Sequence, residues 1–169
     1  MAASSYPLAR FRPVEPVRSF GEDDLRRAME LLFYAYRDFT AEPDKMLQAL
    51  AYGRAHHRVI HFVGRNRGIT VSELLAILKI TKQSLGRVLS QLIRDGIVRQ
   101  DAGTSDKRHR HLTLTENGRA LEEQVSADQR RRIAEAFAAA GLEAVVGFEA
   151  VLRNMINNAA DLERLDRGR

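Results

Sequence analysis

The sequence contains no cysteine among its 169 residues. Disulfide bonds, thiolate catalysis and thiol redox sensing are therefore excluded, as are zinc sites that depend on sulfur ligands. No apolar run approaches the roughly 20 residues that a membrane-spanning helix needs. Residues 1–20 also lack the continuous apolar stretch of a secretory signal. We therefore expect a cytoplasmic protein with a flexible N-terminal arm over residues 1–20 and no membrane partner.

Catalytic patterns are lacking as well. No Ser-His-Asp spacing, phosphate-cradling glycine loop or paired-carboxylate cleft stands out, so we expect no enzymatic activity and no cofactor. His57 and His61 have the i, i+4 spacing that can place two imidazoles on one metal ion, but no Glu lies in the register of a zinc-protease helix. For the cluster of His56, His57 and His61, a metal site is the less favoured alternative to packed, pocket-lining or pH-sensing histidines.

The positive charge is concentrated in one short segment. The composition, with 44% hydrophobic and 29% charged residues, is typical of a globular protein. Between Lys79 and His111 the chain carries eight basic and three acidic residues, a difference equal to the net charge of +5 of the whole chain. Such a local excess indicates an anionic partner, and nucleic acid is the partner we expect.

Helical periodicity covers most of the chain. An apolar stripe predicts a helix over residues 22–39, and Pro43 is expected to interrupt it and begin a second helical region that Gly68 ends. Thr115 is expected to cap a long helix to about residue 140, and Gly141 to separate it from a last helix over residues 142–162. The many apolar groups of this last helix need cover from the 25–36 helix or from a second subunit, which predicts a homodimer.

Two short helices in the middle of the chain form a predicted helix-turn-helix. Thr70 and Glu73 match a capping box for the first helix, and Thr81 can cap a second helix that Gly96 ends. The second helix has an apolar stripe on one side and hydrogen-bonding residues on the other, which is typical of a helix that reads the major groove. The expected DNA-reading residues, with Gly86 among them allowing close backbone approach, are Thr81, Lys82, Gln83, Ser84 and Arg87; Ser90 and Gln91 are on the same face.

A basic hairpin is predicted directly after this helix. Short strands are expected over residues 97–100 and 110–114, with Lys107 and Arg108 at the tip between them and Arg110 further along the strand. An arginine at such a tip can enter a narrow minor groove, and Asp106 is interpreted as the residue that orients it. Helix and hairpin together predict a sequence-specific binder of double-stranded DNA. The alternative is a winged-helix interaction module with an acidic protein partner.

These motifs resemble the MarR family of multiple-antibiotic-resistance regulators, and within it a PetP-like subgroup. The resemblance covers about residues 22–162. It is carried by four stretches: Thr70 to Leu74, Ile80 to Ser84, Leu92 to Val98, and Asp106-Lys107-Arg108 followed by Leu114-Thr115.

The resemblance implies a mainly α fold, a winged helix-turn-helix with flanking N- and C-terminal dimerisation helices. It makes residues 67–115 the DNA-binding region, residues 21–66 and 116–165 the dimerisation region, and Arg108 the minor-groove arginine. Two reading helices in a two-fold dimer would lie about 34 Å apart, which predicts a near-palindromic operator. Many members are repressors released by small aromatic acids or phenols, and the candidates for lining such a pocket here are Tyr36, His57 and His61.

Overall fold

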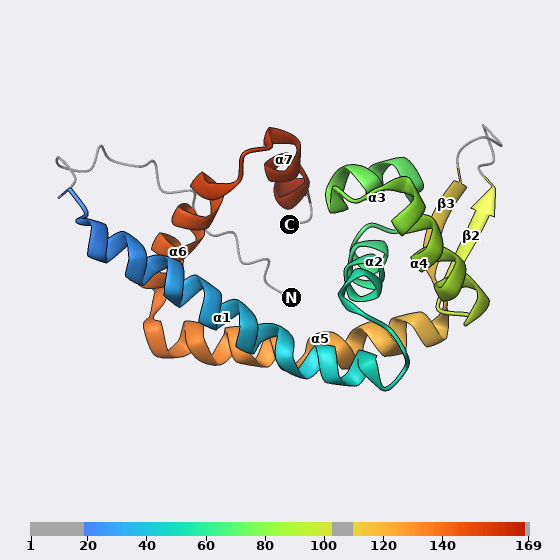
Figure 1. Cartoon of the computed structure of the whole chain (residues 1–169), viewed down its shortest axis with the longest axis horizontal. Helices are drawn as coiled ribbons and strands as arrows, with labels where there is room; N and C mark the ends of the chain where they lie inside the picture. Colours follow the sequence, from blue (N-terminus) through green and yellow to red (C-terminus); the bar gives the residue numbers. More distant parts are fainter. Residues whose placement is uncertain (1–18, 103–109, 168–169) are drawn as a thin grey trace, which may run out of the picture. The chain divides into compact units, whose positions relative to one another are not determined.

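The computed structural model describes residues 19–102 and 110–167. The chain divides into two compact units, residues 1–36 and 37–169, and the boundary falls inside the first helix. The predicted N-terminal arm lies almost entirely outside the described residues. The elements run in the order α1 (Glu22–Gln48), α2 (Arg54–Arg65), β1 (Ile69–Thr70), α3 (Val71–Leu78), α4 (Lys82–Arg94), β2 (Val98–Ala102), β3 (Arg110–Leu114), α5 (Glu116–Ala140), α6 (Leu142–Met155) and α7 (Ala159–Arg167) (Figure 1).

Helix α1 continues through Pro43, contrary to the prediction that this residue would begin a new helix. Proline has no backbone N–H, so the carbonyl of Phe39 four residues earlier receives no bond from position 43. The side chain of Gln129 in α5 supplies the missing donor, since its Nε2 lies 3.2 Å from the Phe39 carbonyl oxygen. A contact between residues far apart in the sequence therefore lets the helix run on to Gln48.

Helix α2 shares one hydrophobic core with the helix-turn-helix. Its buried residues Val59, Ile60 and Val63 belong to the same cluster as the buried leucines of α3 and α4. Helices α2, α3 and α4 and the small sheet lie together in this core (Figure 1). One face of α4 is therefore buried in the core, and the opposite face is exposed. The members of the core are Leu47, Tyr52, Val59, Ile60, Val63, Ile69, Leu74, Leu85, Val88, Leu89, Leu92, Val98, Leu112, Leu114 and Val125.

The sheet has three antiparallel strands in the order β1-β3-β2. The two strands of the predicted hairpin are present, with Val98 opposite Leu114 and Gln100 opposite Leu112. The sequence did not predict β1, which has two residues and pairs Ile69 with Leu112. A strand this short carries no periodicity, so only its pairing with β3 defines it.

The C-terminal region forms two helices where the sequence predicted one over residues 142–162. Helix α6 ends at Met155 and α7 begins at Ala159. Asn158 begins the second of these helices. Its Oδ1 accepts a hydrogen bond from the Ala160 backbone nitrogen at 3.1 Å, which is the bond that an N-cap residue makes. The break at Gly141 was predicted correctly and has a φ of +82°. Within the described residues, none of the helices has the length and apolar character to cross a membrane.

Candidate nucleic-acid interface

The helix-turn-helix is built from the two caps that the sequence predicted. Thr70 Oγ1 accepts from the Glu73 backbone nitrogen at 3.2 Å, and the Thr70 backbone nitrogen donates to Glu73 Oε2 at 2.8 Å. These bonds hold the pKa of Glu73 below its usual value. Lys79 takes a left-handed conformation with φ of 51°, which turns the chain sharply after α3. Thr81 then caps α4, accepting from the Ser84 backbone nitrogen at 3.1 Å.

Helix α4 has two clearly different faces. Leu85, Val88, Leu89 and Leu92 are buried in the core. Lys82, Gln83, Ser84 and Arg87 are exposed, and Thr81 shares a hydroxyl–hydroxyl bond of 2.9 Å with Ser84 at the N-terminus. Across the part of the chain that the structure describes, Lys82, Gln83 and Arg87 make no ion pair or hydrogen bond to another side chain. The helix therefore presents donors and cations that no internal partner occupies.

Gln91 differs from this pattern. The sequence placed it on the outward face, but its Oε1 lies 3.0 Å from His56 Nε2 of α2 and its side chain is half-buried. The backbone nitrogen of Gly53 donates to His56 Nδ1 at 3.1 Å, so Nε2 carries the ring proton and donates it to Gln91. Gln91 thus holds α4 against α2, and it is removed from the expected reading face.

Tyr52 makes a second polar link between the same two regions. Its hydroxyl donates to Asp95 Oδ2 at 2.9 Å, and its ring stacks on His56 with centroids 4.9 Å apart. Burial, together with the bond to the Asp95 carboxylate, raises the pKa of Tyr52 to about 12. Sequence reasoning missed this pairing because Tyr52 belongs to no motif and lies 43 positions from Asp95.

The three clustered histidines make different contacts. His56 contacts α4, whereas His61 Nδ1 lies 3.7 Å from Glu122 Oε1 of α5. His57 is half-buried, and this burial together with the neighbouring His61 lowers its pKa. The described residues contain no set of three or more His, Asp or Glu side chains arranged to hold a metal ion.

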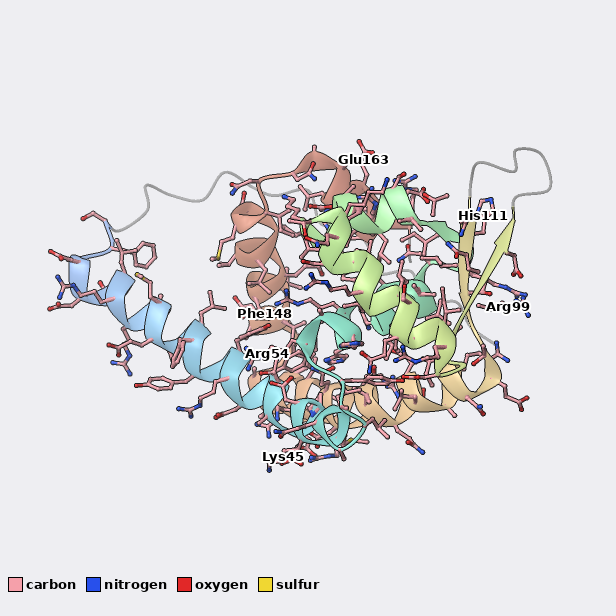
Figure 2. All side chains as sticks on the ribbon, turned by 45° about the vertical axis from the view of Figure 1, so that its right-hand side comes forward. Lys45, Arg54, Arg99, His111, Phe148 and Glu163 are labelled. Carbon is pink, nitrogen blue, oxygen red and sulfur yellow. The ribbon has the colours of Figure 1, made fainter. Side chains whose placement is uncertain are left out.

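The hairpin base is described but its tip is not. The predicted wing residues Asp106, Lys107 and Arg108 lie outside the described residues. Arg110 is exposed on β3 and donates through Nη1 to Gln100 Oε1 at 3.3 Å. Arg99 and His111 lie on the two facing strands (Figure 2). His111 Nδ1 donates to the Gly68 carbonyl at 2.7 Å, and the ring is half-buried.

A cavity of about 710 Å³ lies between α7 and the edge formed by α2, β1 and α3. His61, one of the predicted pocket residues, lines it; His57 does not line it, and Tyr36 belongs to the other structural unit. Four arginines and two acids line the cavity together with several apolar side chains. The lining residues are His61, Phe62, Arg65, Asn66, Arg67, Gly68, Ile69, Glu73, Ile77, Ile156, Asp161, Arg164, Leu165 and Arg167.

Helix α6 leaves its apolar side chains uncovered. None of its residues is buried within the described chain. Phe148, which Figure 2 labels, is 52% exposed, although the centroid of its ring lies 5.8 Å from that of Phe137 of α5. Val146, Val151 and Met155 are more exposed still. An apolar surface of this extent on a helix is a mark of an interface.

Comparison with known proteins gives one close relative and several similar folds. A model described as MarR family matches residues 52–109. The HTH-type transcriptional regulator PetP of Rhodobacter capsulatus is 51% identical over 138 residues, which are 82% of this chain and 83% of the relative. Streptococcus pneumoniae FabT in complex with DNA has a TM-score of 0.70 at 20% identity, covering 82% of this chain and 99% of that one. A mutant MarR from E. coli complexed with operator DNA has a TM-score of 0.59 at 21% identity, covering 79% and 96%.

Proposed function

Because this chain belongs to the MarR family of transcriptional regulators, we propose that it is a cytoplasmic, homodimeric repressor that binds a near-palindromic site in duplex DNA. The family resemblance predicted from the motifs is confirmed, and the relatives are regulators rather than enzymes, as the sequence also predicted. The observation that supports the DNA-binding role most directly is the outward face of α4. Its exposed cations and amide offer donors to base edges and phosphates, while the opposite face anchors the helix in the core.

In this proposal the residues of α4 and the hairpin have separate roles. Thr81, Lys82, Gln83 and Ser84 approach base edges at the N-terminal turn of the helix, where a recognition helix reaches deepest. Arg87 contacts a guanine or a phosphate. Lys107, Arg108 and Arg110 would follow the hairpin into the adjacent minor groove, oriented by Asp106.

In this proposal the dimer forms through helices α1, α5, α6 and α7. Two observations support a dimer: the uncovered face of α6, and the exposure of Leu31, Leu32, Phe33 and Tyr34 at four successive positions of α1. A run of large exposed apolar side chains on one helix is typical of a surface that a partner covers. Helix α2 shares the core of the winged helix, so we assign it to the DNA-binding body, although the sequence placed the boundary at residue 66.

Removing a free cation from α4 tests the DNA-binding role. We expect Arg87→Ala and Lys82→Ala each to weaken binding to duplex DNA about tenfold and to reduce the slope of log affinity against log salt by about 1, because each phosphate contact releases condensed counterions. The measurement is a fluorescence anisotropy titration at several salt concentrations, with duplex selected from a genomic fragment pool.

Lys45→Ala is the matched control, since Lys45 is an exposed cation of α1 that pairs with Glu42. It should bind as the parent protein does. The parent protein failing to bind any duplex at low salt would overturn the proposal and favour the alternative of an interaction module with an acidic protein. Binding by both variants at parental affinity would show that another surface contacts the DNA.

For effector control, we propose that the cavity beside α7 takes a small aromatic carboxylate. Its volume of about 710 Å³ lies within the ordinary range for small-molecule sites, about 300–1,000 Å³. Its arginines suit a carboxylate, and Phe62, Ile69 and Leu165 suit an aromatic ring. Since one wall is α7 and the other includes α3, the first helix of the helix-turn-helix, a ligand there would contact both regions.

A series of benzoates added to the protein should raise its melting temperature by several degrees, because a ligand present at 100 times its Kd stabilises the folded state by about 2.7 kcal/mol. Arg67→Ala, which removes a lining cation, should lose this rise. His57→Ala should keep it, since His57 does not line the cavity. Thermal shifts that are equal in the parent and in Arg67→Ala would place the ligand elsewhere.

A further inference from the structure

The outward face of α4 includes a glycine. Gly86 is exposed and lies one helical turn from Lys82 and Gln83 on one side and from Ser90 on the other. Glycine in the interior of a helix is less favourable than alanine because it loses more backbone freedom on folding. A glycine at this position lowers the stability of the helix, so its presence needs a reason.

The fold itself gives no such reason. A Cβ added at Gly86 would meet no atom within 4 Å among the described residues. Its backbone angle is an ordinary helical one, since Gly68, Gly96 and Gly141 are the described glycines with positive φ. In contrast, a Cβ at Gly118 would lie only 2.1 Å from the carbonyl oxygen of Ile97. Gly118 is thus required by internal packing, and Gly86 is not.

The surroundings of Gly86 indicate what lies outside it. Lys82, Gln83 and Arg87 near it are long, polar and exposed, and among the described residues they make no ion pair or hydrogen bond to another side chain. Where such side chains bind base edges, the helix backbone between them comes close to the floor of the groove. The absence of a Cβ at that point allows the backbone to come closer by the thickness of a methyl group.

We propose that Gly86 is a specificity-determining residue whose bare backbone packs directly against base edges in the major groove. This inference rests on the proposed DNA-binding function. The close contact exists only when α4 is fully inserted at its own site. Binding to unrelated DNA depends on phosphate contacts, which do not need the helix to reach the groove floor. A methyl group at position 86 therefore impairs specific binding and leaves non-specific binding intact.

The test compares Gly86→Ala with the parent on two probes, a duplex selected by the parent from genomic fragments and a random-sequence duplex of equal length. We expect affinity for the selected duplex to fall at least tenfold and affinity for the random duplex to change less than twofold. The melting temperature of the variant should rise by about 2–4 °C, since alanine favours the helix. The melting temperature would then rise while the affinity for the selected duplex falls. A loss of structure cannot produce this combination.

Ser90→Ala is the matched control, because it changes the next position on the same face without adding bulk. The inference is overturned if Gly86→Ala loses no more affinity for the selected duplex than Ser90→Ala does, or if it loses equally on both probes. A parent protein that binds neither probe would instead refute the proposed function, so the two failures are distinguishable.

Discussion

Gly118→Ala is expected to lower the melting temperature by about 10 °C, because the added methyl group has no room. Its Cβ would lie 2.1 Å from the Ile97 carbonyl oxygen and 3.1 Å from the carbonyl carbon. Both are backbone atoms, which cannot turn aside as the end of a side chain can. To relieve the overlap, the first turn of α5 must move away from the loop that joins α4 to β2.

That movement breaks the hydrogen bonds that fix the corner. The Thr115 backbone nitrogen donates to the Ile97 carbonyl at 3.0 Å, and the Gly118 backbone nitrogen donates to Thr115 Oγ1 at 3.0 Å. Overpacking and lost bonds together give an expected destabilisation of about 3 kcal/mol or more. Thermal unfolding followed by circular dichroism measures it.

Gly64→Ala is the control for a glycine that is tight but adaptable. Its added Cβ would lie 2.9 Å from Leu114 Cδ1, the far end of a flexible side chain, so a small rotation relieves the contact. We expect Gly64→Ala to lower the melting temperature clearly less than Gly118→Ala does. Equal melting temperatures for Gly118→Ala and the parent would mean that α5 does not begin against Ile97. The corner matters for function because it links the base of the hairpin to the long helix of the proposed dimer.

Local patterns in the sequence were sufficient to predict the reading helix. Both caps, Thr70 and Thr81, use a side chain within three residues of the bond that it makes, so spacing alone identifies them. The apolar stripe of α4 fixes which face is buried, and with it the exposure of Lys82, Gln83 and Arg87. These conclusions need no knowledge of contacts between residues far apart in the sequence.

The errors arose where distant residues decide the outcome. Pro43 would end an isolated helix, but Gln129 satisfies the carbonyl that it leaves free. Gln91 has the helical position of a DNA-reading residue, but His56 binds it from α2. Neither partner is close in the sequence, and no spacing rule connects them. The hairpin tip with Arg108 lies outside the described residues, so its role stays a prediction.

Placing two aspartates on α6, as Val151→Asp with Met155→Asp, is expected to convert the protein to a monomer and to weaken operator binding at least a hundredfold. Both side chains are exposed in the single chain, at 60% and 56%, so charge there does not disturb internal packing. In a dimer the same positions would bring uncompensated charges into an apolar interface, which is strongly unfavourable. Linked half-sites gain about 10²–10⁴ in affinity over a single contact, and separation of the subunits removes that gain.

Two measurements separate loss of the dimer from loss of the fold. Analytical ultracentrifugation gives the mass, and circular dichroism shows whether the helices remain. The control, Asn154→Asp with Gln124→Glu, adds the same charge at exposed polar positions and should stay dimeric. The parent's melting temperature should also rise with protein concentration, as it must when association stabilises the folded state. A parent that sediments as a monomer would refute the dimer while leaving the face of α4 intact as a DNA contact. The two halves of the proposed function therefore stand on separate observations: the dimer on the exposed apolar side chains of the helices, and the DNA contact on the exposed cations of α4.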